Sequence, residues 1–355
     1  MADFTDARYL GLRHASSELP GWPALTTGRP AVLAEPYGAL EAAAALARLQ
    51  GTEAATLLPS TLHLFWDLLI QLARDARSAL LLDDGAYPIL QWAADGARVT
   101  GASVHRFAHH DVGALAALAG RAARAGLRPV IVCDGFCTGC NHAAPLTDYA
   151  RIAAASGGLL VLDDTQALGL LGSAPGPSCP YGHGGGGSLR WHGLGGDHIV
   201  VGASLAKAFG APLAVLAGGN ELVRRFVRDS GTRMHCSPPS VPVVQAARVA
   251  LARNAGEGES LRERLLRMVR RLRTTLVRAG LDAVGVLPFP VQSFFSRGAP
   301  TAATLWRLAQ RLRDAGVQAL LTRGCRGPAP RLSFLVTARH CAADIDPIAA
   351  LLARG

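Results

Sequence analysis

Lys207 is the only lysine in a chain of 355 residues that otherwise uses arginine for its strongly basic side chains. Lysine and arginine carry the same charge, but lysine can lose its proton when desolvated and attack a carbonyl as a free amine. The chemistry that requires such an amine is Schiff-base formation, typically with pyridoxal phosphate (PLP). A drift in composition towards arginine would also leave one lysine by chance, so the neighbouring motifs must decide between these interpretations.

A candidate phosphate site precedes this lysine in the chain. The apolar run 54–58 predicts a strand, and Pro59-Ser60-Thr61 then opens a helical pattern from Leu62 to Leu72. The free N–H groups and the dipole of a helix start favour an anion there. Serine and threonine are also ordinary N-cap residues, so both interpretations of Ser60 and Thr61 stay open.

Polar residues follow several predicted strands. Short apolar runs alternate with helical patterns over residues 36–241, which predicts a large α/β domain with a mostly parallel sheet covered on both faces. Ligands of such sheets bind beyond the carboxyl ends of the strands. The residues at or just after these ends are Asp83, Asp134, Asp163 and Ser204, from predicted strands 79–82, 129–133, 158–162 and 199–203. We therefore expect them to converge on one site.

The remaining segments have a different character. Residues 1–35 show little periodicity and form a separate N-terminal segment, and residues 242–355 predict a smaller α+β domain. That domain is expected to begin with two helices, 242–254 and 259–279. Residues 172–196 form a long connection holding Gly184–Gly187, which we interpret as a flexible loop without a ligand.

Three cysteines have the spacing Cys133-x3-Cys137-x2-Cys140, which radical enzymes use to hold an iron–sulfur cluster. Here the motif follows a predicted sheet strand, and buried cysteines also act as small apolar side chains. The cluster stays a lesser alternative, and we assign no metal site from the sequence.

Composition excludes several classes of protein. Half of the residues are hydrophobic and 17% are charged, as in globular proteins. The net charge of +10 comes from scattered arginines without interleaved aromatic residues, so we expect no nucleic-acid partner. No long uncharged apolar run or apolar signal core is present, so we expect no membrane partner and a cytoplasmic protein with reduced cysteines.

Together these motifs resemble the fold-type I PLP enzymes. Within them the chain is most similar to the α-oxoamine synthases, which include 8-amino-7-oxononanoate synthase, 2-amino-3-ketobutyrate CoA ligase and serine palmitoyltransferase. The resemblance implies the PLP-dependent transferase fold type I. It rests on five motifs in the correct order: Tyr9-Leu10-Gly11-Leu12, Cys133-Asp134-Gly135-Phe136-Cys137-Thr138, Leu162-Asp163-Asp164-Thr165-Gln166, Ser204-x-x-Lys207-Ala-Phe-Gly, and Arg331-Leu332-Ser333-Phe334 with Thr337-Ala338-Arg339-His340.

The resemblance implies a role for each matching residue. Lys207 would form the Schiff base with PLP and move protons at the substrate Cα, Asp163 would bind the protonated pyridine nitrogen, and Tyr87 would stack on the ring. On spacing alone, a core tyrosine is the less favoured interpretation of Tyr87. The other cofactor-binding residues implied are Ser60, Thr61, Leu62 and Ser204 at the phosphate, Asp134, Thr138 and Gln166 at the ring, and Ser237 from the neighbouring subunit of a homodimer.

Two departures from the family limit the functional prediction. Gln166 replaces a histidine that contacts the cofactor, and glutamine cannot act as an acid or base. Ser333 replaces the arginine that grips the substrate carboxylate, and serine offers no bidentate fork. Either Arg331, Arg339 or Arg323 substitutes for that arginine, or the amine substrate makes no ordinary α-carboxylate contact.

We therefore expect a PLP-dependent transferase that forms a carbon–carbon bond at an amino-acid-derived carbanion, possibly in specialised biosynthesis. Its substrates would be a small amino acid or amine and a second carbonyl or acyl compound. The alternative is a PLP-dependent aminotransferase, which exchanges amine and keto groups. A less favoured third hypothesis is an iron–sulfur protein that uses Cys133, Cys137 and Cys140.

Overall fold

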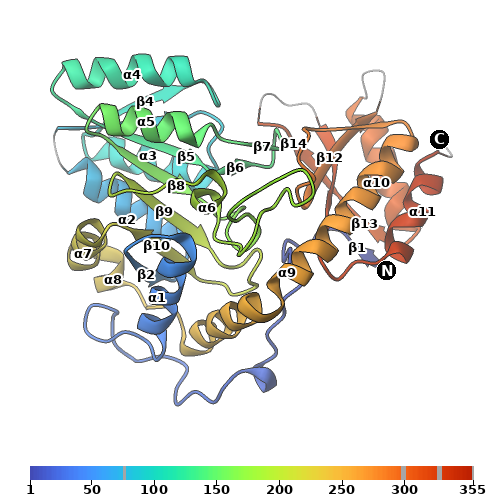
Figure 1. Ribbon diagram of the computed structural model, residues 1–355, viewed down its shortest axis with the longest axis horizontal. Coiled ribbons are helices and arrows are strands. Elements are labelled where there is room, and N and C mark those ends of the chain that lie inside the picture. Colours follow the sequence, from blue (N-terminus) through green and yellow to red (C-terminus); the bar gives the residue numbers. More distant parts are fainter. Residues whose placement is uncertain (75–76, 297–300, 326–329, 354–355) are drawn as a thin grey trace.

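The computed structural model describes residues 1–74, 77–296, 301–325 and 330–353. Its largest element is a seven-stranded sheet in the order β2-β10-β9-β8-β5-β3-β4 (Figure 1). Every neighbouring pair is parallel except the two that involve β10. The strands are β2 (Ala54–Leu58), β3 (Ser78–Asp83), β4 (Ser103–Phe107), β5 (Arg128–Asp134), β8 (Leu159–Asp163), β9 (Ile199–Ser204) and β10 (Ala214–Gly218). The predicted, mostly parallel α/β sheet is confirmed.

Helices cover both faces of this sheet because the strands are apolar on both sides. Alternate residues of β3, such as Leu80 and Leu82, pack with α2 (Thr61–Ala73) and α3 (Pro88–Val99). The intervening Leu81 faces α4 (Val112–Arg124) and α5 (Leu146–Ala155). Toward β2 and β10, α1 (Ala39–Gln50) packs on the sheet and ends at Gly51, whose φ of 78° places it in the left-handed region.

A second sheet lies at the other end of the molecule (Figure 1). It is antiparallel, in the order β11-β12-β15-β14. Its strands are β11 (Leu281–Ala283), β12 (Val291–Ser296), β14 (Leu320–Arg323) and β15 (Pro330–Leu335), and its core is completed by α10 (Ala302–Asp314) and α11 (Ala342–Ala353). The N-terminal strand β1 (Ala2–Asp3) pairs with β13 (Val317–Gln318), so the first residues of the chain lie beside the last third.

One continuous helix, α9 (Val241–Arg278), joins the two sheets, so the expectation of two helices here was wrong. Gly256 and Gly258 lie between the two expected helices, and Gly258 lies at a close contact. A Cβ on Gly258 would meet the side chains of Asn254 and Arg262. Asn254 Nδ2 donates to the carbonyl of Gly184 (3.0 Å), and Arg262 donates to the carbonyl of Gly169 (2.9 Å). The middle of α9 therefore holds the glycine-rich connection.

The predicted ranges can be compared with these elements. Residues 36–241 contain the seven-stranded sheet, and residues 242–355 contain the four-stranded one. We propose that these ranges are the two domains, with α9 as the element that they share. The glycine-rich connection includes α6 (Ser188–His192), and two further short helices, α7 (Asn220–Asp229) and α8 (Gly231–His235), follow β10. Across the described residues, no helix combines the length and the apolar character that a membrane crossing needs.

A buried ion pair anchors the N-terminal segment. Arg233 is 4% exposed and donates to Glu35, to Thr56 Oγ1 (2.8 Å) and to the carbonyl of Leu57. Arg233→Met is expected to lower the free energy of unfolding by about 3 kcal/mol, because it leaves a carboxylate and a hydroxyl without their donor. Denaturant titration measures this loss. Arg224→Met, which breaks an exposed pair with Glu221, should leave stability nearly unchanged. Equal effects of the two variants would contradict the assignment.

Candidate active site

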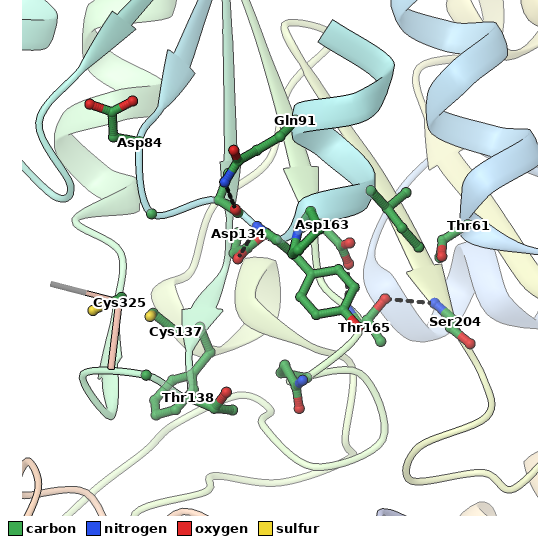
Figure 2. A pocket seen from close by; sticks show the side chains of 18 of the residues that line it. Thr61, Asp84, Gln91, Asp134, Cys137, Thr138, Asp163, Thr165, Ser204 and Cys325 are labelled. Carbon is green, nitrogen blue, oxygen red and sulfur yellow. Dashed lines mark hydrogen bonds between the residues drawn. The ribbon is translucent and has the colours of Figure 1, made fainter. Parts of the chain in front are cut away.

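A cavity of about 520 Å³ opens at the carboxyl ends of the parallel strands (Figure 2). Asp134, Asp163 and Ser204, the last residues of β5, β8 and β9, all line it. The other predicted residues that line it are Thr61, Tyr87, Cys137, Thr138, Gln166, Lys207 and Arg323. The structure therefore brings together residues that lie more than 140 positions apart in the sequence, as expected for residues at the ends of parallel strands.

Lys207 lies in the turn between β9 and β10 and lines this cavity. Burial lowers the pKa of its amine, and the nearby carboxylate of Asp163 opposes that shift. A desolvated amine is more readily deprotonated than an exposed one, and the deprotonated form is the nucleophile. The geometry therefore provides a partly buried amine beside one carboxylate.

Asp163 is 6% exposed, and its Oδ1 accepts the N–H of Thr165 (2.9 Å). Burial raises the pKa of its carboxyl, while the Thr165 hydrogen bonds and the charge of Lys207 lower it. Asp134 is its register partner on β5 and accepts the N–H of Tyr87 at 2.9 Å. Burial and the charge of Asp163 raise the pKa of Asp134 well above its usual range. A cation placed between these two carboxyls would lower the pKa of both.

Thr165 lines the cavity but was missed in the sequence. Its Oγ1 accepts the N–H of Ser204 (2.9 Å), which ties the end of β9 to the turn after β8 (Figure 2). Its position directly after the Asp163-Asp164 pair was the available signal. Asp164 turns away from the cavity and accepts the N–H of Ser188 (2.8 Å), and burial raises the pKa of its carboxyl to about 7.

The start of α2 supports both interpretations of its first residues. Ser60 is the N-cap: its Oγ accepts the N–H of His63 (3.4 Å) and lies 2.8 Å from His63 Nδ1. Thr61, the first residue of the helix, lines the cavity. Leu62 is 40% exposed, so only its amide could serve the predicted role. The helix N-terminus therefore borders the cavity beside Thr61.

Gln166 and Tyr87 occupy the remaining predicted ring positions. Tyr87 precedes α3, is 54% exposed and lines the cavity. Gln166 Oε1 accepts the O–H of Tyr9 (2.5 Å), and Tyr9 is itself buried against Phe289. The tyrosine of the N-terminal segment therefore orients the glutamine side chain.

Several predicted residues lie outside the cavity. Ser237 is exposed between α8 and α9, and Asp83 hydrogen-bonds His109 instead of joining the other strand-end residues. Arg331 donates to the carbonyl of Gly139, and Arg339 is exposed; neither lines the cavity as described. The positions of Arg331 and Arg339 therefore give no direct support for their predicted contact with the substrate.

One arginine does line the described part of the cavity, and it is Arg323, at the end of β14. Ser333 cannot substitute for the expected arginine, because its hydroxyl is buried between Ser293 Oγ (2.8 Å) and Thr322 Oγ1 (2.6 Å). The four-stranded sheet therefore presents Arg323 to the cavity in place of a residue at position 333.

Comparisons with known proteins agree with this fold. The aminotransferase class I and II family model matches residues 12–335. An 8-amino-7-oxononanoate synthase of Alkalilimnicola ehrlichii is 32% identical over 263 residues, covering 73% of this chain and 62% of that protein. A putative 8-amino-7-oxononanoate synthase of Thermosynechococcus vestitus is 27% identical over 363 residues, covering 99% and 88%. The chain thus spans less than two thirds of the first of these relatives.

Solved structures agree on the architecture. Serine palmitoyltransferase of Sphingomonas wittichii superposes with a TM-score of 0.82 at 19% identity, covering 99% of this chain and 86% of that one. An 8-amino-7-oxononanoate synthase of Francisella tularensis gives a TM-score of 0.74 at 16% identity, covering 99% and 97%. At these identities the likeness concerns the fold, and it confirms the predicted fold type I.

Proposed function

Because this chain belongs to the aminotransferase class I and II family, with α-oxoamine synthases among its relatives, we propose that it is a PLP-dependent transferase that forms carbon–carbon bonds. The observation that carries the proposal is the juxtaposition of the only lysine with a buried aspartate in one cavity at the strand ends. When bound, PLP supplies an electron sink that stabilises a carbanion at the amino-acid Cα.

The residues present fit this cofactor. The Lys207 amine would hold the aldehyde carbon and move the proton at the substrate Cα. Asp163 would face the pyridine nitrogen, whose positive charge offsets the cost of burying the carboxylate. Thr61, at the helix N-terminus, and Ser204 would hold the phosphate, and Thr165 fixes the backbone of Ser204. The proposed chemistry thus requires an amine at position 207, which an arginine cannot provide.

The predicted side-chain roles around the ring follow from the lining of the cavity. We assign Tyr87 to stacking on the ring, and Asp134, Thr138 and Gln166 to its edge. Asp134 already accepts the N–H of Tyr87, so it positions the segment that carries this aromatic side chain.

For the substrates, we propose an amino acid and a second acyl compound. Arg323, which lines the cavity, would receive the amino-acid carboxylate through its planar fork of donors. The network of Ser293, Ser333 and Thr322 occupies the position where the resemblance implies an arginine. This shift of the carboxylate-binding group to the end of β14 would select a differently oriented amino acid.

We further propose that the protein is a cytoplasmic homodimer without a nucleic-acid or membrane partner. The exposed Ser237 is available to a second subunit, as the resemblance implies for a residue that reaches the neighbouring phosphate. The scattered arginines form no stripe with aromatic residues.

Product analysis tests the proposed reaction. Holoenzyme would be incubated with panels of amino acids and acyl thioesters and then analysed by mass spectrometry. Carbon–carbon bond formation releases free thiol and a joined amino ketone. Transamination instead converts an amino acid to its keto acid without any thioester, and that result would overturn the proposal in favour of the aminotransferase alternative.

Removal of the Tyr9 hydroxyl is expected to disturb the cofactor through Gln166. In Tyr9→Phe the glutamine loses its buried donor, so stability should fall by about 1 kcal/mol and the visible band of the bound cofactor should shift. Tyr181→Phe is the matched control, because Tyr181 is also buried but donates to the carbonyl of Pro288, away from the cavity. An unchanged spectrum in Tyr9→Phe would argue against contact between Gln166 and the cofactor.

A further inference from the structure

Four side chains meet beside the cavity without a role in the proposed reaction. They are His109, in the loop between β4 and α4, Cys137 on β6 (Phe136–Cys137), Cys140 in the turn before β7 (His142–Ala143), and Cys325 after β14. Their side-chain nitrogen and sulfur atoms all lie within 4.8 Å of one another. Figure 2 shows the side chains of Cys137 and Cys325 next to each other. Three thiols and one imidazole therefore converge on a single point.

The spacing of these atoms suits one tetrahedral ion. With metal–sulfur and metal–nitrogen bonds of about 2.3 and 2.0 Å, a tetrahedral angle separates sulfur from nitrogen by about 3.5 Å. Cys140 Sγ and His109 Nε2 are 3.6 Å apart. An iron–sulfur cubane would hold its ligands farther apart, because each ligand binds a different iron.

Hydrogen bonds already orient the histidine for this purpose. His109 Nδ1 lies 2.6 Å from Asp83 Oδ1, so Nε2 is the atom that faces the sulfurs. Asp83 is 1% exposed and is fixed by the N–H groups of Gly85 (2.7 Å) and His110 (3.2 Å). A carboxylate that holds the far nitrogen of a histidine is the usual outer support of a zinc ligand. This role would explain why Asp83 does not line the cavity with the other strand-end residues.

We propose that His109, Cys137, Cys140 and Cys325 bind one zinc ion in a closed structural site. Three thiolates and one neutral imidazole form a complete set of four, which leaves no open position for catalysis. Cys133, which the sequence grouped with Cys137 and Cys140, is 0% exposed and packs with Ile131 and Leu162 in the sheet core. Two cysteines of the spacing motif, Cys137 and Cys140, are thus joined by His109 and Cys325, and Cys133 takes no part.

The ion would join the two sheets at the mouth of the cavity. Three ligands belong to segments that connect elements of the seven-stranded sheet, and Cys325 follows β14 of the four-stranded one. The site carries one net negative charge with zinc bound, and the Arg331 guanidinium donates to the carbonyl of Gly139, next to Cys140. The zinc would therefore fix the segment that presents Arg323 to the cavity.

Metal analysis of the purified full-length holoenzyme tests the site. Elemental mass spectrometry should find one zinc per chain in the wild type and in Cys341→Ser, whose cysteine is exposed and lies outside the group. Cys325→Ser and Cys140→Ser should lose at least nine tenths of it. Retention of full zinc in both ligand variants would overturn the proposal, as would a wild type that neither contains zinc nor takes it up when zinc is added.

A second measurement avoids variants that fail to fold. After removal of zinc by a chelator under reducing conditions, Co²⁺ is added to the wild type. Tetrahedral thiolate coordination gives intense d–d bands in the red, away from PLP absorbance. Those bands are the expected result. Their absence, stoichiometric inorganic sulfide with iron, or disulfides among Cys137, Cys140 and Cys325 in the protein as isolated would each overturn zinc binding. PLP content is assayed in parallel, so failure of the metal site and failure of the proposed function remain distinguishable.

Discussion

Lys207→Arg is expected to abolish the visible absorbance of the holoenzyme and its activity. Arginine keeps the positive charge beside Asp163, but its guanidinium stays protonated near neutral pH and cannot act as a nucleophile. Loss of proton transfer at Cα alone would cost about 10²–10⁴-fold in rate, and loss of the covalent link adds to that. The measurement combines the absorbance spectrum, borohydride trapping followed by peptide mapping, and turnover of the substrate pair found by product analysis.

The variant isolates the amine because charge is conserved. Since Lys207 is the only lysine, borohydride should attach the cofactor to one peptide in the wild type and to none in the variant. Lys207→Ala provides the second test, in which a small amine added to the buffer should restore part of the activity. A yellow Lys207→Arg protein with a borohydride-stable adduct elsewhere in the chain would refute the assignment.

Asp163→Asn should have the second largest effect. Asparagine has the same shape and its carbonyl oxygen still accepts the Thr165 N–H, but it offers no charge to the pyridine nitrogen. Loss of one partner from a buried charge pair costs about 2–5 kcal/mol, or roughly 30- to 5,000-fold in affinity. Equilibrium titration of the apoenzyme with PLP measures the affinity, and turnover at saturating PLP separates binding from electron withdrawal.

The adjacent Asp164 supplies the matched control. It is equally buried and accepts the N–H of Ser188, but its carboxyl does not line the cavity. Asp164→Asn should therefore keep PLP affinity within a few-fold of the wild type. Equal losses in the two variants would mean that burial of a charged group, rather than contact with the cofactor, explains the effect of Asp163→Asn.

Local sequence patterns predicted the elements that are apolar throughout. The runs that became β3, β5, β8 and β9 are buried on both faces, and short apolar runs are the signal of such strands. The edge strand β4 was missed because it pairs only with β3 and carries Ser103, His105 and Arg106. Helix α3 was missed with it.

The residues of the candidate site also differ in how far a local sequence pattern could predict them. Lys207 and Asp163 belong to motifs with fixed spacing, so the sequence alone indicated them, and the cavity contains both. The sequence left Arg323 as one of three candidate arginines, and only the packing of the four-stranded sheet, about 115 positions after Lys207, brings it to the cavity. His109 and Cys325 join Cys137 for the same reason: long-range packing places them together.

Helix α9 has a mechanical consequence. Its 38 residues span about 57 Å, and a helix of that length resists bending. Its first half packs against α1, its second half against the four-stranded sheet, and Asn254 and Arg262 clamp its middle to the glycine-rich connection. A tilt of the smaller sheet would therefore be transmitted as a lever movement about this clamp. If the cavity mouth opened or closed, α9 would transmit the movement to α1, on the far side of the molecule.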